Sequence, residues 1–109
     1  MNYYERLDYL SSDGMMWFDF VIMDCGPDIG WRVYIINVDD ADYGYRDVSG
    51  HATHRNHFDG DTYKSICWST PICSFQEAKV IAALWADTTA LYIKKGGSFD
   101  AIAQKLSKK

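Results

Sequence analysis

One segment near the C-terminus constrains the fold of this chain more than any other feature. Ser74 and Glu77 form a capping box, in which the serine oxygen accepts an orphan amide hydrogen bond and the glutamate reaches back. At the other end two lysines favour the carbonyl terminus of a helix, and Gly96 follows as a stop. These signals predict a helix over residues 75–95. Apolar side chains cover most of its circumference, so burial on more than one side is expected.

Two apolar segments ahead of this helix have the composition of β-strands. Residues 15–23 are rich in aromatic and β-branched side chains, and residues 31–38 alternate between two faces. The stretch 24–30 is dense in turn residues, so the two segments are predicted to pair as an antiparallel hairpin. A third strand is predicted over residues 63–68. It ends before Pro71, because proline cannot donate to a sheet ladder.

Short helices are predicted at both termini. Residues 2–10 place a tyrosine and two leucines on one helical face, and Ser98 can cap a final helix over about residues 99–105. The element order predicts an α+β fold, with a small antiparallel sheet of about three strands packed against the long C-terminal helix. At this length, residues 1–109 are expected to form a single domain.

Residues 39–62 are predicted to form a long loop between the second and third strands, with a short edge strand at residues 43–46. A loop of this length is uncommon in a compact domain and usually has a function. Tyrosine and arginine, the favoured residue types of protein interfaces, alternate there with acidic residues, and all three histidines follow within seven residues. We predict that the loop binds a protein partner through Tyr43, Tyr45, Arg46, His51, His54 and His57. In the competing interpretation, the tyrosines fold over the edge of the core.

The histidines also allow a metal-site hypothesis. Imidazoles with nearby aspartates are donors of the kind that Zn²⁺ or Ni²⁺ uses. Their spacing matches neither a pair on one helix face nor a Cys/His finger, so other ligands would have to complete the site. The candidates for those ligands are Cys67, Cys73 and Asp47. The alternative function is therefore a zinc-binding protein, of hydrolytic reaction class, with His51, His54 and His57 as ligands.

Three cysteines, an odd number, predict a reducing cytoplasmic location rather than a disulfide framework. A thiol nucleophile at Cys67 or Cys73 would need a base such as His54 within hydrogen-bond reach, and Cys73 stands just before a predicted helix N-terminus, which favours a thiolate. A small buried side chain is the commoner role of cysteine. No apolar run approaches the ~20 residues that span a bilayer, and the N-terminus lacks the order of a signal peptide. No membrane association is expected.

Charge is distributed unequally along the chain. Residues 1–63 hold four arginines against twelve acidic residues, a net charge of −8, while residues 64–109 hold seven lysines against three acidic residues, a net charge of +4. An acidic surface does not suit phosphate binding, so nucleic acid is not the expected partner. It suits docking on a basic protein surface, although ordinary solubility charge is the competing explanation.

The predicted order of one helix, three antiparallel strands and a capped, alanine-rich helix resembles the double-stranded RNA-binding domain. Residues 77–83 (Glu-Ala-Lys-Val-Ile-Ala-Ala) are similar to the start of that family's last helix. The family holds phosphates with a lysine cluster at this helix start, whereas here Lys79 is the only cation. The resemblance implies the fold but not RNA binding. A degenerate RNA-binding domain is a further alternative, and it would use Lys79, Lys94, Lys95, Lys105, Lys108 and Lys109.

The sequence contains no glycine-rich phosphate loop, no nucleophile elbow and no Cys-x2-Cys pair. We therefore predict a small cytoplasmic protein-interaction module without catalytic activity and without a cofactor. Small size and acidity fit an accessory protein of a phage or mobile element that blocks a host nucleic-acid-handling enzyme, and we treat this setting as a hypothesis.

Overall fold

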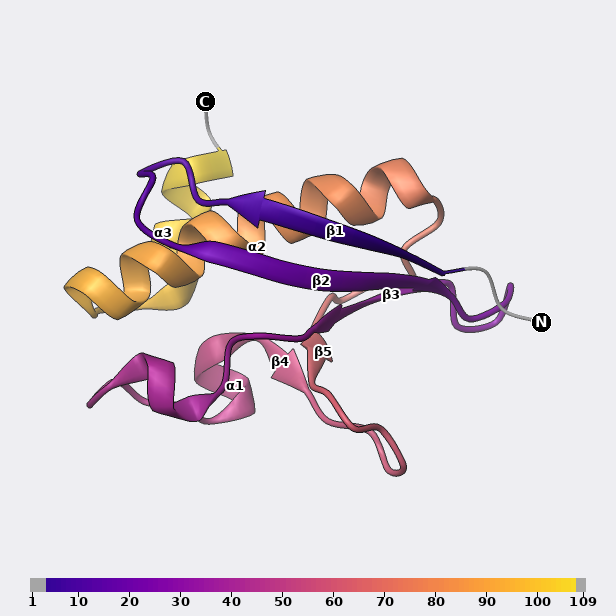
Figure 1. The fold of residues 1–109 in the computed structure, drawn as a ribbon, viewed down its shortest axis with the longest axis horizontal. Helices are drawn as coiled ribbons and strands as arrows, with labels where there is room; N and C mark the ends of the chain where they lie inside the picture. The colour runs from indigo at the N-terminus through magenta and orange to yellow at the C-terminus, as the bar shows by residue number, and fades with distance from the viewer. Residues whose placement is uncertain (1–3, 108–109) are drawn as a thin grey trace.

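The computed structural model describes residues 4–107 and has an α+β architecture built on a five-stranded antiparallel sheet (Figure 1). The predicted fold class is confirmed, and the sheet has five strands rather than about three. In chain order the elements are β1 (Tyr4–Leu10), β2 (Trp17–Asp24), β3 (Trp31–Ile35), the 3-10 helix η1 (Asp40–Tyr43), α1 (Gly50–Thr53), β4 (Arg55–Asn56), β5 (Ser65–Ile66), α2 (Phe75–Lys95) and α3 (Phe99–Ser107). None of these described helices is long and apolar enough to cross a membrane.

The predicted N-terminal helix is wrong. Residues 4–10 form β1, which pairs with β2 in an antiparallel register that includes Leu7 opposite Phe20; residues 2 and 3 of the predicted helix lie outside the described part of the chain. The strand alternates its side chains, and Tyr9 points toward α2, where its hydroxyl donates to Asp87 at 3.0 Å. The two leucines fit a helical spacing, but pairing with β2 decides the conformation, because seven consecutive register pairs join the segment to the sheet on one side.

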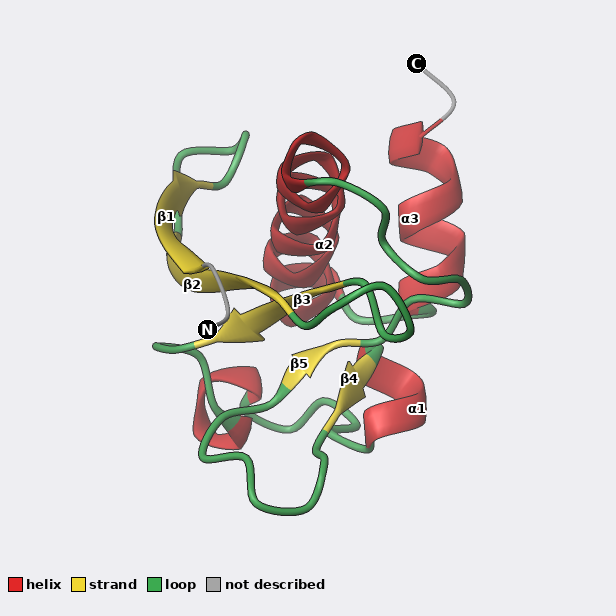
Figure 2. Cartoon of the chain, turned by 90° about the vertical axis from the view of Figure 1, so that its right-hand side faces the viewer, coloured by secondary structure: helices red, strands yellow, loops and turns green. Residues whose placement is uncertain are grey.

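The strand order is β1-β2-β3-β5-β4. The predicted hairpin of β2 and β3 is confirmed, with Ile22 opposite Val33 in the register. α2 lies across one face of the sheet, and α3 lies beside α2 on the side away from β1 (Figure 2). The likeness to the double-stranded RNA-binding domain is therefore limited to three strands followed by a helix, because a strand stands where that resemblance implies the first helix.

The core forms where β2 and β3 face α2. Trp85 of α2 makes edge-to-face contacts with Phe18 and Phe20, at centroid distances of 5.8 and 6.0 Å. α2 begins and ends where the sequence predicts, and the Ser74 hydroxyl accepts a hydrogen bond from the amide of Glu77 at 3.1 Å. It is also buried on more than one side, because α3 covers part of the surface that the sheet leaves open.

The predicted loop of residues 39–62 contains three short regular elements. They are η1, α1 and β4, and β4 pairs with β5 through Arg55 and Asn56. The predicted edge strand at residues 43–46 is wrong, because η1 ends at Tyr43 and a turn follows. Asp39 caps η1 by accepting from the Ala41 amide, so the acidic residues there act as local helix caps.

Candidate functional site

Arg55 of β4 holds the segment between β3 and β5 in place. Its side chain is 1% exposed, and it donates from Nε to the Thr53 hydroxyl and from Nη2 to the Asp40 carboxylate, both at 2.8 Å. Hydrogen bonds from Lys64 and then from Arg55 lower the pKa of Asp40 below its ordinary value. The guanidinium also lies over the Tyr43 ring, 4.7 Å from Cζ to the ring centroid. One arginine therefore connects η1, α1 and β4.

Two of the six residues predicted to contact a partner make their recorded contacts within the fold. Tyr43 is 1% exposed and makes an edge-to-face contact with Tyr92 at 6.1 Å, and its burial raises its pKa to about 12. Arg46 donates from Nε and Nη2 to the carbonyls of Ile93 and Lys94, both at 3.2 Å, and so caps the C-terminus of α2. The prediction is wrong for Tyr43, which is in the core, and the Arg46 donors are engaged within the chain.

The other four predicted residues lie at the surface in separate places. Tyr45 is fully exposed in the turn after η1. His51 lines a hollow beside the α2–α3 turn, His57 lines one beside η1 and the end of β3, and His54 lines a third against α3. The histidines are close in sequence, but the backbone of α1 and of the turn that ends it directs their side chains to different parts of the surface.

The structure does not assemble the three histidines as one ligand set. His57 Nε2 lies 2.9 Å from the Asp61 carbonyl oxygen, and His54 Nε2 lies 2.6 Å from the Asp100 carboxylate. Within residues 4–107, no group of three His, Cys, Asp or Glu side chains is placed to hold a metal ion. The side chains of His51, His54 and His57, predicted as zinc ligands, therefore do not converge on one point within residues 4–107.

The end of α1 aims His54 at α3. His54 has a φ of +54°, in the left-handed region, and its amide donates to the Gly50 carbonyl as a helix cap. A Cβ at Gly50 would lie 2.6 Å from the Arg55 carbonyl oxygen, so this tight return of the chain requires glycine. The His54 ring then stacks on Phe99 at 5.0 Å and pairs with Asp100.

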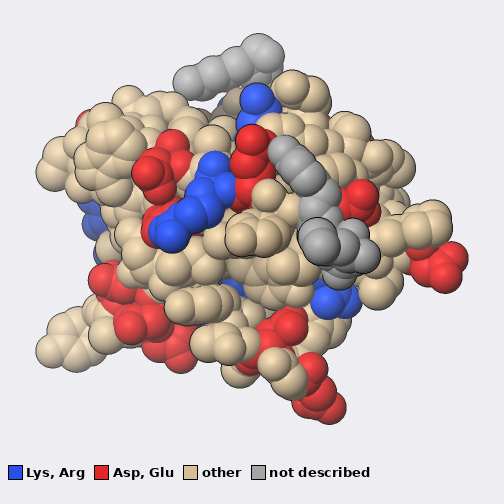
Figure 3. All heavy atoms as spheres, turned by 45° about the vertical axis from the view of Figure 1, so that its right-hand side comes forward, with Lys and Arg blue, Asp and Glu red and all other residues tan. Residues whose placement is uncertain are grey.

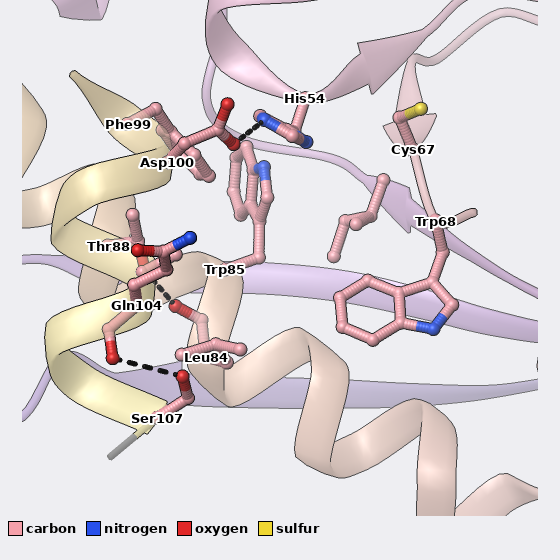
Figure 4. Close-up of a pocket in the computed structure, with 12 residues that line it drawn as sticks. His54, Cys67, Trp68, Leu84, Trp85, Thr88, Phe99, Asp100, Gln104 and Ser107 are labelled. Atoms are coloured by element: carbon pink, nitrogen blue, oxygen red, sulfur yellow. Dashed lines mark hydrogen bonds and ion pairs between the residues drawn. The ribbon is translucent and has the colours of Figure 1, made fainter.

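His54 stands at the rim of a surface cavity of about 340 Å³ between α2, α3 and the end of β5 (Figure 4). We call this cavity the His54 groove and define it by His54, Trp68, Leu84, Trp85, Phe99 and Ala103. Trp85 is buried at its base, and its indole N–H donates to the Thr53 carbonyl at 3.1 Å. The base of the groove is therefore apolar, because the indole N–H of Trp85 is already used in a hydrogen bond within the fold.

Polar groups of the groove lie mainly along α3. Asp100, Gln104 and Ser107 stand on successive turns of that helix, and the Ser107 hydroxyl donates back to the Gln104 carbonyl at 3.2 Å (Figure 4). Within the groove, the Thr88 hydroxyl donates to a carbonyl of its own helix at 2.7 Å. The groove therefore has an apolar base and a polar rim. This arrangement suits a ligand whose apolar group fills the base while an adjacent polar group meets the rim.

Cys67 also lines the groove but is not paired with its predicted base. The Cys67 amide donates to the His54 carbonyl at 2.8 Å, which brings the two residues side by side through the backbone. In Figure 4 the sulfur points away from the His54 ring, and no hydrogen bond is recorded between the two side chains in the described residues. All three cysteines are free thiols. The geometry gives no arrangement for thiol activation by His54.

The sequence did not indicate that α3 contributes to the site. Phe99, Asp100, Ala103 and Gln104 all come from this helix, whose apolar spacing is equally consistent with simple packing on α2. The acidic residue in its first turn is a common helix-stabilising feature. No sequence signal separates these residues from an ordinary terminal helix, since the pairing of Asp100 with His54 spans forty-six positions of the chain.

The lysines proposed for RNA binding are dispersed. Lys79 lies over the Phe75 ring at 5.3 Å, near the start of α2. Lys94 lies near the other end of the helix, about 22 Å away along the axis. Lys108 and Lys109 lie outside the described residues.

The chain matches no protein-family model, no curated protein and no solved structure.

Proposed function

We propose that this protein is a non-catalytic protein-interaction module whose His54 groove receives an apolar side chain of a partner protein. The observation that carries the proposal is the open apolar cavity of about 340 Å³ with the His54–Asp100 pair at its rim. Its volume is at the lower end of the roughly 300–1,000 Å³ typical of ligand pockets. Buried apolar side chains that fill such pockets supply much of the binding energy of protein interfaces.

The rim indicates the kind of partner. The Asp100 side chain is 73% exposed and Trp68 is partly exposed, so an acidic group and an aromatic ring flank the cavity. Figure 3 shows acidic side chains at several places on one face of the molecule, and the net charge of the whole chain is −4. At the groove itself, the negative charge comes from Asp100. We therefore expect an apolar side chain flanked by lysine or arginine on the partner. A basic, nucleic-acid-handling host enzyme, blocked by a phage or mobile-element protein, is the setting that this chemistry fits.

A matched pair of substitutions in α3 tests the groove. Ala103 lines the cavity, whereas Ala101 is exposed on the same helix. Ala103→Phe should fill the cavity, and Ala101→Phe adds the same side chain to solvent. Both variants should keep the wild-type far-ultraviolet circular dichroism spectrum, because neither removes a contact.

The binding measurement uses side-chain analogues as probes. Indole and isobutanol, which represent tryptophan and leucine side chains, are titrated into labelled protein, and the amide shifts of Thr88, Ala103 and Gln104 are followed by NMR. We expect saturable shifts in wild type and in Ala101→Phe, and none in Ala103→Phe. Shifts that persist in Ala103→Phe, or that are absent from the wild type, would contradict the groove as a binding site.

A further inference from the structure

β1 has a free edge of seven residues. In the described residues it pairs only with β2, and it is the first strand of the sheet order. It contains no proline and its register runs without interruption from Tyr4 to Leu10. A long edge without proline or a bulge is a template for pairing with another strand, because its outward amides and carbonyls lack partners in the sheet.

The hairpin register fixes which residues of β1 offer those groups. The Ser11 amide donates to the Met16 carbonyl at 2.9 Å, so Ser11 and, by alternation, the odd-numbered residues of β1 bond to β2. The even-numbered residues therefore direct their backbone groups outward. They also place their side chains on the sheet face away from α2, since Tyr9, an odd-numbered residue, contacts α2. The outward set is Tyr4, Arg6, Asp8 and Leu10.

We propose that β1 is a homodimerisation strand, which pairs antiparallel with β1 of a second copy about a two-fold axis at Leu7. This interface is separate from the His54 groove and does not depend on its function. In this register, Arg6 faces Asp8 of the second copy and Tyr4 faces Leu10 of the second copy. Both pairs join residues with outward backbone groups, so each can exchange two backbone hydrogen bonds. The surface is self-complementary, as an isologous dimer requires.

Charge selects this register over the neighbouring ones. A two-fold axis moved to Arg6 would place Arg6 opposite Arg6, and an axis at Asp8 would place Asp8 opposite Asp8. Like charges directly opposite each other destabilise a strand pair. A shift by a single residue would pair outward with inward backbone groups and break the ladder. Only the axis at Leu7 combines matched hydrogen bonds with opposite charges.

The isolated chain leaves a charge imbalance that this dimer corrects. Asp8 stands opposite Asp19 in the β1–β2 register, and Arg6 forms an ion pair with Asp19. No ion pair or hydrogen bond is recorded for the Asp8 side chain in residues 4–107. The second copy supplies the missing cation, because its Arg6 would lie beside Asp8 while keeping donors for its own Asp19.

Apolar side chains on the same face support the same register. Tyr4 is 62% exposed and Leu10 is 39% exposed, and Trp17, opposite Leu10 on β2, is 61% exposed. Pairing would place Tyr4 of one copy against Leu10 of the other, with Trp17 next in the row. Aromatic–aliphatic neighbours across strands stabilise a sheet, and here they would remove exposed apolar surface from water.

Sedimentation equilibrium of the full chain at low salt, over a concentration series that reaches the high micromolar range, tests the proposal. Wild type should form a concentration-dependent dimer. Asp8→Arg should weaken dimerisation by roughly tenfold or more, because two symmetry-related pairs change from attraction to repulsion. Asp8→Arg should still fold, since it places an arginine opposite Asp19. Asp28→Arg, an exposed turn substitution with the same change of net charge, is the control and should dimerise like wild type.

Mixing separates this register from any other dimer. Arg6→Asp and Asp8→Arg should each dimerise more weakly than wild type when alone. Mixed together they should form a tighter heterodimer, because two arginines then face two aspartates. The double variant that exchanges both residues should dimerise again. A wild type that stays monomeric, an Asp8→Arg that dimerises like wild type, or a mixture that fails to associate would each overturn the proposal.

Discussion

The β1–β2 hairpin and the segment of residues 39–62 hold their shapes in opposite ways. The hairpin is a continuous ladder of seven register pairs, and one of its faces leaves large side chains in solvent. The regular elements of the segment are short, with a two-residue strand, a four-residue α-helix and a four-residue 3-10 helix, and the segment depends on side chains that point inward. Tyr43 and Arg55 are among them.

The comparison shows that residue type does not distinguish a binding residue from an internal support. Tyrosine and arginine are favoured at interfaces because they combine a large apolar surface with a polar end. The same property lets Tyr43 and Arg55 fill the space beneath an irregular segment. The β1–β2 hairpin, whose first strand was predicted as a helix, also leaves aromatic side chains exposed, Tyr4 at 62% and Trp17 at 61%.

The largest effect should come from truncating one of the two tyrosines of the segment. Tyr43→Ala removes a buried ring from the core and should lower the free energy of unfolding by about 4 kcal/mol. Tyr45→Ala, at a fully exposed position, should change it by less than about 0.5 kcal/mol. Urea denaturation of both variants measures the difference. Equal values would mean that Tyr43 is not a core residue.

Removal of the buried arginine should cost nearly as much. Arg55→Met keeps the side-chain length but loses the hydrogen bonds to Thr53 and Asp40, and we expect a loss of about 3 kcal/mol. Arg6→Met on the hairpin removes one exposed ion pair and should cost less than about 1 kcal/mol. Dilute protein in urea avoids any contribution of dimerisation. A small effect at Arg55 would show that the ladder of β4 and β5 holds the segment without it.

Alkaline pH should weaken the segment through Tyr43. Its pKa is raised by burial from 10.0 to about 12, so the fold favours the neutral phenol. The corresponding stability is complete below pH 10 and is lost as pH rises through 12, by about 3 kcal/mol in total. Tyr43→Phe cannot ionise, so its unfolding free energy should fall less over that range than that of wild type. Parallel pH curves for the two proteins would contradict this assignment.

The smallest effect should come from the cap on α2. Arg46→Ala removes two hydrogen bonds to the last carbonyls of the helix and should lower stability by about 1 kcal/mol. Arg46→Lys retains the charge but not the two-pronged geometry, and it should lie between alanine and wild type. Thermal unfolding of the three proteins gives the order. An unchanged melting temperature for Arg46→Ala would show that the cap does not stabilise the fold. The prediction that Arg46 contacts a partner would then regain support.

The parts of the fold predicted correctly are those with local signals. α2 is specified by Ser74 and Gly96 at its ends, and the β2–β3 hairpin by turn residues between two apolar segments. β1 was predicted as a helix because a tyrosine and two leucines of residues 2–10 are spaced to share one helical face. Its strand character comes from pairing with β2, which is not encoded within the seven residues themselves.

The candidate site was predicted only in part for the same reason. His54 was identified from the histidine cluster, but its partners Phe99 and Asp100 come from a helix more than forty positions later. The direction of each histidine depends on the single left-handed residue that ends α1. The sequence shows which residue types are available for a site, but it does not show the directions in which their side chains point.

By itself the sequence determined the fold class, the long helix and its ends, and the central hairpin, because capping, turn chemistry and periodicity act over a few residues. Tertiary structure alone decided that Tyr43 is core, that Arg46 is a cap, that the three histidines separate, and that α3 completes the groove with Asp100. Each of these depends on contacts between distant parts of the chain, where packing and pairing outweigh local preference.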